Sequence, residues 1–233
     1  MPETLTDKIK NDLLRLGADI AGFGRLDELP DNVREGLPVG ISVAVKYPKE
    51  IIRGIAELPT HEYHEWYNKL NDRLDRIVTC GAEMLREMGY KAIAYNRKYY
   101  RSGENRDNTS LPHKTVATRA GIGWIGKSAL LVTEKYGSAI RLSSILTDAP
   151  LDTALPVNKS RCGACMICTN ACPGGAVSGK AWEVGLYRDE FFDPVKCRKT
   201  AIEQSKKGFG EELTLCGKCI EICPYTQSYI KNI

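Results

Sequence analysis

The sequence lacks the features that would direct the chain into or through a membrane. No apolar run approaches the roughly 20 residues that a transmembrane helix needs. Residues 1–17 alternate acidic and basic side chains and contain no apolar signal-peptide core. No internal repeat of solenoid length is visible either. These absences predict a cytoplasmic protein without a repeat architecture.

The chain also lacks a strong excess of charge of one sign. Its formal net charge is +4 over 233 residues. That charge is too small to indicate a nucleic-acid-binding protein by itself, although it permits an anionic ligand. Hydrophobic residues make up 42% and charged residues 27% of the chain, as in an ordinary globular protein. This length suits one large domain or two small ones.

Hydrophobic periodicity predicts alternating helices and strands in the first part of the chain. Residues 5–16 place apolar side chains on one helical face, and Gly17 is positioned to cap that helix. A longer helix is expected over Thr60–Gly89, with its first residue as the N-cap and its last as the stop. Buried strands are expected over residues 19–24 and 41–48, and a further strand over residues 91–96. This alternation up to about Pro150 predicts an α/β or α+β domain.

The character of the sequence changes after about residue 150. Residues 152–160, DTALPVNKS, have the composition of a linker. Eight of the nine cysteines lie between Cys162 and Cys223, in a segment with little regular periodicity. We therefore expect a domain boundary here. Residues 1–155 would form a cofactor and substrate domain, and residues 156–233 a cysteine-rich domain.

Residues 121–128, GIGWIGKS, fit two phosphate-binding motifs. They match the Gly-x-x-x-x-Gly-Lys-Ser pattern of a P-loop, and their glycines fit the Gly-x-Gly-x-x-Gly dinucleotide fingerprint. Both motifs need a strand before them and a helix after them. Here a helix starting near Pro112 is expected before the glycines, and two strands around a turn at Lys135–Gly137 after them. We therefore favour a simple helix-to-strand turn, which also lets backbone approach a flat or anionic ligand. A P-loop nucleotide-dependent protein is the remote alternative.

The cysteine spacing is that of ferredoxin-type clusters. The run from Cys162 reads Cys-x2-Cys-x2-Cys-x3-Cys-Pro, and the run from Cys216 reads Cys-x2-Cys-x3-Cys-Pro. In the two-cluster arrangement the last cysteine of each run serves the other cluster. Cys197 supplies the one ligand still missing. The expected ligands are Cys162, Cys165, Cys168 and Cys223 for one [4Fe–4S] cluster, and Cys172, Cys197, Cys216 and Cys219 for the other.

Zinc is the alternative occupant of the cysteine segment. Zinc sites usually pair two Cys-x2-Cys units across a loop. The first run instead has four closely spaced cysteines followed by a proline, which favours iron–sulfur clusters bound by soft thiolates. Cys80 stands apart, inside the expected long helix. We interpret it as a small buried hydrophobe rather than a nucleophile.

Two clusters of this type indicate a path for electrons. Ferredoxin-type clusters commonly have reduction potentials near about −400 mV. A free-standing electron carrier would need only the last third of this chain. The preceding residues therefore predict a cofactor and substrate site. The leading interpretation is an oxidoreductase supplied by a low-potential donor of the ferredoxin or flavodoxin type.

Three motifs together resemble the epoxyqueuosine reductase family. They are AGIGWIGKSALLVTEKYGS at 120–138, LTDAPL at 146–151 and the arrangement of the eight cysteines. The resemblance spans most of the chain. It implies a cobalamin-dependent iron–sulfur protein related to the core of reductive dehalogenases. The implied fold is a nitroreductase-like α/β (α+β) domain that holds cobalamin, followed by a small bacterial-ferredoxin-like domain with two [4Fe–4S] clusters.

The resemblance also implies site residues. The family's general-acid aspartate falls on Asp107, although Asn108, Ser110 and His113 stand where the family has threonine, proline and glutamate. His113 is the second candidate for donating a proton or a hydrogen bond. The residues expected to hold the corrinoid are Gly121, Gly123, Trp124, Gly126, Lys127, Ser128, Ser138 and Arg141.

The resemblance leaves the substrate open between epoxyqueuosine in tRNA and a small molecule. Epoxyqueuosine reductases proper continue into a helical-repeat domain that helps hold tRNA, whereas this sequence stops at Ile233. The basic and aromatic stretch Tyr95–Arg106 could stack bases and meet phosphates, but a polar loop over the active site is the slightly preferred interpretation. The alternative function is an electron-transfer partner that reductively activates another corrinoid or metal protein.

Overall fold

The structure is a computed structural model that describes residues 3–101 and 109–231. Within these ranges no helix is both long enough and apolar enough to span a bilayer. The chain forms two compact units. The first comprises Met1–Val45, Leu70–Ile122 and Arg141–Val157, and the second comprises Lys46–Lys69, Gly123–Ile140 and Asn158–Ile233.

The two units are interleaved along the chain, which differs from a single division near residue 155. The last segment of the second unit begins close to that position, but two earlier segments also belong to it. Hydrogen bonds attach them to the cysteine-rich segment. The Ser138 amide donates to Thr226 Oγ1 (3.1 Å), and the Tyr229 hydroxyl donates to the Tyr47 carbonyl (2.8 Å). Composition describes a segment's own character and not its distant contacts, so the boundary near 155 stays a prediction.

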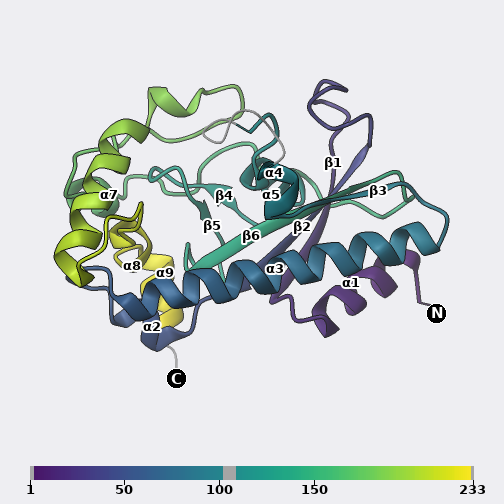
Figure 1. Ribbon diagram of the computed structural model, residues 1–233. Coiled ribbons are helices and arrows are strands. Elements are labelled where there is room, and N and C mark those ends of the chain that lie inside the picture. Colours follow the sequence, from purple (N-terminus) through teal and green to yellow (C-terminus); the bar gives the residue numbers. More distant parts are fainter. Residues whose placement is uncertain (1–2, 102–108, 232–233) are drawn as a thin grey trace. The chain divides into compact units, whose positions relative to one another are not determined.

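A four-stranded sheet organises the first unit (Figure 1). Across the sheet the strands are β1 (Ile20–Arg25), β2 (Val39–Lys46), β6 (Ile140–Thr147) and β3 (Ala92–Tyr95). Strands β1 and β2 are antiparallel, with Phe23 opposite Ile41. Strands β3 and β6 are also antiparallel, with Ala94 opposite Ile145. Strand β2 is buried along nearly its whole length, which explains why its sequence is apolar without alternation.

Helices α1 (Leu5–Arg15) and α3 (His61–Glu87) pack on the sheet as the periodicity predicted. A side-chain carbon at Gly81 would lie 2.8 Å from side-chain atoms of both Ile145 and Leu13. The glycine therefore lets α3 approach β6 and α1 closely. Thr60 Oγ1 accepts a hydrogen bond from the Tyr63 amide (3.1 Å), so the predicted N-cap is confirmed.

Helix α5 (His113–Arg119) precedes the glycine motif, as expected. Gly121 follows it with φ +68°, and the Ile122 amide donates to the Ala117 carbonyl (3.2 Å). This is a glycine-terminated helix end. Helix α4 (Arg97–Arg101) follows strand β3 and completes the described helices of the first unit.

Besides the first residues of α3, the second unit contains short elements and one longer helix, α7 (Pro194–Phe209). The others are α2 (Lys49–Arg53), β4 (Trp124–Ile125), β5 (Leu131–Val132), α6 (Ile167–Asn170), the 3₁₀ turn η1 (Arg188–Glu190), α8 (Lys218–Glu221) and α9 (Pro224–Lys231). Two strands do flank a turn near Lys135–Gly137, as predicted. They do not pair with each other, however, because β5 pairs with β4 and β6 joins the larger sheet.

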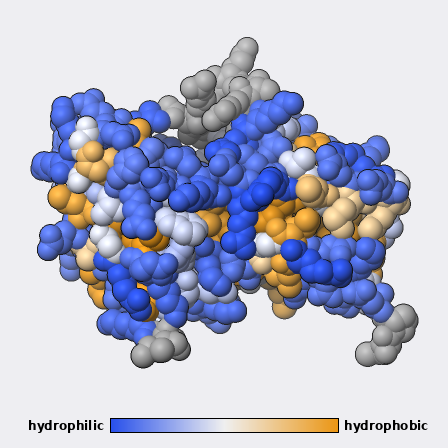
Figure 2. Space-filling view, turned by 60° about the horizontal axis from the view of Figure 1, so that its bottom comes forward, coloured by the Kyte–Doolittle hydropathy of each residue, from blue (hydrophilic) through white to orange (hydrophobic). Residues whose placement is uncertain are grey.

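The visible surface is mostly hydrophilic. On the face shown in Figure 2, polar and charged residues predominate and apolar areas are smaller. Scattered apolar side chains on a surface are normal. This face gives no indication of function, and the candidate site lies among the cysteines.

Candidate metal centre

Four of the predicted ligands form thiol group 1, which we define as Cys162, Cys165, Cys168 and Cys223. They border a cavity of about 230 Å³, many times the roughly 10–15 Å³ that one water needs. Its lining residues are Gly126, Lys127, Ser128, Val132, Arg161, Cys162, Cys165, Cys168, Cys219, Cys223, Pro224 and Tyr225. The cavity thus joins cysteines from both runs with residues of the glycine motif.

The thiols of group 1 influence one another electrostatically. Burial, followed by the nearby thiols of Cys162, Cys223 and Cys165, raises the pKa of Cys168 to about 11. These are the three partners that the spacing predicts for it. A metal-binding cysteine must lose its proton, so metal binding at these thiols would release protons.

The remaining ligands form thiol group 2, defined as Cys172, Cys197, Cys216 and Cys219. Burial raises the pKa of Cys197, and Cys172 and Cys216 raise it further. Burial also raises the pKa of Cys219 far above its ordinary value, with Cys216 and Cys197 adding to the effect. Asp193 caps the helix that carries Cys197, because its carboxylate accepts from the Lys196 amide (2.9 Å). The structure therefore brings together the members of each predicted set, while their role as ligands stays a prediction.

The thiols suit an iron–sulfur cluster in their chemistry. Among residues 3–101 and 109–231, no three His, Cys, Asp or Glu side chains are close enough to share one metal ion. A [4Fe–4S] cluster has a different requirement, because four thiolates surround a core of several irons. Soft thiolates and a cavity between them suit such a core.

The glycine motif does not have the context of a P-loop. Helix α5 precedes it and strand β4 lies inside it, so no strand–loop–helix unit is present here. A side-chain carbon at Gly126 would lie 3.5 Å from Cys162 Sγ. Lys127 Nζ donates to the Cys165 carbonyl (2.9 Å). The end of the motif therefore borders thiol group 1, and the helix-to-strand interpretation is confirmed.

Two other predicted corrinoid contacts are buried beside the cysteine segment. Trp124 is fully buried, and its ring lies edge-on to Tyr225 at 4.9 Å between centroids. The Ser138 amide donates a hydrogen bond to Thr226 Oγ1. Trp124 Nε1 and Ser138 Oγ have no hydrogen-bond partner within the described chain. Buried polar atoms of this kind can accommodate a polar ligand atom.

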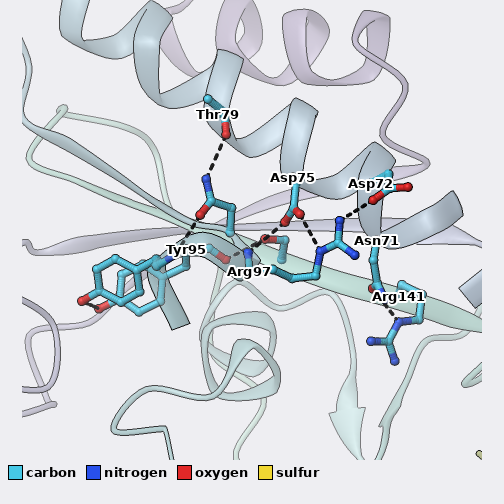
Figure 3. Close-up of polar contacts among 10 residues, drawn as sticks. Asn71, Asp72, Asp75, Thr79, Tyr95, Arg97 and Arg141 are labelled. Carbon is cyan, nitrogen blue, oxygen red and sulfur yellow. Dashed lines mark hydrogen bonds and ion pairs between the residues drawn. The ribbon is translucent and has the colours of Figure 1, made fainter. Parts of the chain in front are cut away.

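A polar cluster in the first unit holds Arg97 and Arg141 (Figure 3). Arg97 Nε donates to Asp75 Oδ2 (2.6 Å), and Arg97 Nη2 pairs with Asp72. Arg141 Nε donates to Asn71 Oδ1 (3.1 Å). These partners all come from helix α3. Arg141, a predicted corrinoid contact, is thus anchored to α3, and Gly121 lies in the same unit.

The aromatic and basic stretch is folded where the structure describes it. Tyr95 is 2% exposed, and its ring lies 4.3 Å from that of Tyr99. The Tyr99 hydroxyl donates to Glu35 (2.6 Å), and Arg97 is held by two carboxylates. The loop interpretation is wrong for residues 95–101, which form a strand end and a helix. These side chains have internal partners that compete with nucleic-acid contacts.

Of the two candidate proton donors, the structure describes only His113. Asp107 and Asn108 lie outside the described residues. His113 is half-buried, and its Nδ1 lies 3.0 Å from Ser144 Oγ. Burial and, to a smaller extent, the positive charge of Arg141 together lower the pKa of His113 to about 3. The imidazole is therefore neutral near pH 7. It can donate a hydrogen bond, but it does not carry the extra proton of an imidazolium acid.

Some lining residues of the cavity were not predicted from the sequence. Arg161 and Tyr225 belong to this set. Arg161 lies 5.6 Å from the Trp124 ring centre and pairs with Glu134 (2.7 Å). Adjacency was the available signal, because Arg161 precedes Cys162 and Tyr225 follows the Cys223–Pro224 pair.

The family model for the 4Fe-4S double cluster binding domain matches residues 161–226. The chain is 27% identical to the epoxyqueuosine reductase of Cyclobacterium marinum over 216 residues, which are 87% of this chain and 62% of that protein. It is 32% identical to the epoxyqueuosine reductase of Listeria monocytogenes over 165 residues, 71% of this chain and 40% of that protein. The chain therefore spans less than two thirds of the length of these relatives.

Solved structures share the fold. The catabolic reductive dehalogenase NpRdhA in complex with 3-bromo-4-hydroxybenzoic acid superimposes with a TM-score of 0.72 and 19% identity, covering 94% of this chain and 31% of that one. An epoxyqueuosine reductase solved with an epoxyqueuosine-modified tRNA-Tyr stem loop gives a TM-score of 0.62 and 19% identity, covering 97% and 66%. At these identities the likeness concerns the fold.

The fold and the thiol site define an iron–sulfur protein of mixed α/β architecture with a ferredoxin-type segment. Within that class, the chain is similar to the epoxyqueuosine reductases. The resemblance that its motifs predicted is confirmed.

Proposed function

We propose that the chain is an iron–sulfur, cobalamin-dependent reductase of the epoxyqueuosine reductase type. It takes electrons from a low-potential donor and delivers them to a corrinoid and then to a substrate. One observation supports this most directly. The eight thiols form two groups inside a segment that matches a double-cluster domain, and the rest of the chain aligns with named reductases.

Each thiol group would hold one [4Fe–4S] cluster. Thiol group 1 borders the cavity described above, and thiol group 2 includes Cys197 of α7 and Cys219 of α8. Because Cys219 also borders the cavity of group 1, the two groups are neighbours. That proximity favours electron transfer from one cluster to the other. A ferredoxin or flavodoxin fits as donor because such clusters have low potentials.

The corrinoid is proposed from the resemblance, together with the unpartnered buried atoms. Ser138 Oγ and Trp124 Nε1 are buried and have no hydrogen-bond partner among the described residues. A corrinoid supplies a cobalt centre that can be reduced to a strong nucleophile. Lys127 is already engaged with Cys165, so its predicted contact with the corrinoid has least support. The nitroreductase-like architecture of the first domain is part of the same proposal.

Epoxyqueuosine in tRNA is the proposed substrate, because the relatives carry the name of that activity and one was solved with an epoxyqueuosine-modified stem loop. Asp107 is the proposed proton donor, by alignment. His113 would hydrogen-bond as a neutral imidazole. In this proposal the basic stretch near Tyr95 does not bind tRNA, because Arg97 and Tyr99 have internal partners.

The proposal is tested with anaerobically purified protein reconstituted with cobalamin. We expect the absorption bands of both the clusters and a protein-bound corrinoid. With a chemical reductant as the electron source, the protein should also reduce the epoxyqueuosine of a tRNA stem loop. Asp107→Asn should lower the rate by about 10²–10⁴-fold, the usual value of general acid catalysis, and leave cluster content unchanged. Clusters without corrinoid binding would instead support an electron-transfer partner of another corrinoid or metal protein.

A further inference from the structure

Lys127 is a buried cation in the turn between β4 and β5. It is 5% exposed. Its ammonium group donates to the Cys165 carbonyl (2.9 Å) and lies 3.5 Å from Met166 Sδ. Within the part of the chain that the structure describes, Lys127 has no carboxylate partner. A carbonyl and a thioether therefore replace the water that a lysine normally keeps.

A buried charge without an opposite charge is costly, so buried lysines usually have an anionic partner. Lys127 borders the same cavity as Cys162, Cys165 and Cys168. The neighbouring Gly126 has no side chain, and a carbon there would lie 3.5 Å from Cys162 Sγ. The glycine thus keeps the turn close to the thiols. The available anion is the set of thiolates that a bound cluster requires.

We propose that Lys127 is a positioning residue that supplies positive charge to the cluster of thiol group 1 and raises its reduction potential. The inference rests on the proposed function, since it needs a cluster at these thiols. Reduction moves one electron from the donor to the cluster and adds one negative charge there. A nearby fixed cation stabilises the reduced form more than the oxidised form. Net charge and hydrogen bonds are among the factors that set cluster potentials.

Arg161 offers a matched comparison, because it borders the same cavity. Its side chain is 54% exposed and pairs with Glu134 at 2.7 Å. Solvent and the carboxylate therefore screen its charge. The two cations differ in burial and pairing, so only Lys127 should affect the cluster strongly.

The experiment is a redox titration of the anaerobic protein, followed by electron paramagnetic resonance. Lys127→Gln keeps a hydrogen-bond donor and removes the charge, whereas Lys127→Arg keeps the charge. In Lys127→Gln we expect one midpoint potential to become more negative. At a fixed solution potential, the ratio of reduced to oxidised cluster should fall about tenfold, a shift of about 59 mV for one electron. The other cluster, Lys127→Arg and Arg161→Gln should stay close to wild type.

Each other result is decisive. Wild-type potentials in a fully loaded Lys127→Gln protein would overturn the inference, as would an equal shift in Arg161→Gln. If Lys127→Gln loses one cluster while Lys127→Arg keeps it, the charge is needed to retain the cluster rather than to set its potential, and the inference is wrong. If both variants lose it, Lys127 acts through packing and the inference is wrong. Iron and sulfide assays on the wild-type protein separate these results from failure of the proposed function, which would leave no cluster to titrate.

Discussion

Burial of His113 and a neighbouring cation both lower the pKa of its imidazole. Burial has the larger effect and the positive charge of Arg141 adds to it, and together they bring the pKa to about 3. An unfolded histidine titrates near 6.5. Between these two values the unfolded chain binds a proton that the folded chain does not. Stability must therefore fall as the pH drops from about 6.5 towards 3, and His113 contributes to that loss.

The expected effect of His113→Gln is a weaker dependence of stability on pH. The free energy of unfolding of the wild type should fall by about 1 kcal/mol more than that of the variant between pH 6.5 and 5.5, because each bound proton contributes about 1.4 kcal/mol per pH unit. Urea denaturation at the two pH values measures this. His61→Gln is the control, since His61 is 60% exposed. Equal pH dependence in wild type and His113→Gln would contradict the lowered pKa.

At the scale of elements, the contact of α5 with β1 depends on a glycine. A side-chain carbon at Gly24 would lie 2.3 Å from the Arg119 carbonyl carbon and 2.5 Å from the Ala120 amide nitrogen. Both are backbone atoms, so no rotamer change can relieve the clash. The end of α5 immediately precedes the glycine motif. A displacement of α5 would therefore be transmitted to Gly121.

Gly24→Ala should destabilise the protein by about 1–3 kcal/mol or more, as overpacking of a core does. Gly54→Ala adds the same methyl group where the nearest atom is 3.4 Å away, and should be close to neutral. The midpoint of urea denaturation compares the two variants. Similar midpoints for both would show that α5 moves away from β1 at little cost.

The sequence predicted these elements well wherever the signal was local. Caps and apolar periodicity located α1, α3 and α5, including Thr60 and Gly121. The pairing of β5 with β4 was missed because a strand pattern shows that a strand exists but not which strand it joins. The same limit applies to the interleaved units, which depend on contacts between distant segments.

For the candidate site, cysteine spacing predicted which thiols lie together, because ligands of one cluster must be close in space. Spacing could not predict that Lys127 turns towards Cys165. That contact joins residues 38 positions apart in the chain. The motif had instead suggested phosphate or a corrinoid. The position of a turn relative to a remote segment is decided by packing, which the motif does not contain.

Helix α7 supports a prediction for thiol group 2, because it carries Cys197 between the two cysteine runs. Cys197→Ala should reduce the iron content from about eight to about four atoms per chain and leave one cluster intact. Cys80→Ala is the matched control, since Cys80 lies in α3 and outside both thiol groups. Iron and acid-labile sulfide are measured in anaerobic preparations. Unchanged iron in Cys197→Ala, or an equal loss in Cys80→Ala, would reject the ligand assignment.

At the scale of the whole molecule, the two units differ in what stabilises them. The first has a four-stranded sheet with the largely buried strand β2. The second contains α6 and α8, of four residues each. Helices this short do not form without tertiary support. A core cluster of Ile125, Ala129, Trp182 and Phe191 supplies part of that support, and the proposed clusters would cross-link the remaining segments.

Removing the clusters by oxidation and chelation should therefore loosen the second unit selectively. Where a metal site forms only in the folded state, its binding free energy contributes to folding. Amide hydrogen exchange should accelerate by at least about tenfold in α6, α7 and α8, equivalent to about 1.4 kcal/mol in the free energy of opening. Strands β2 and β6 should keep their protection, because their hydrogen bonds belong to the sheet. Unchanged exchange around the cysteines after complete loss of iron would show that this segment folds without clusters.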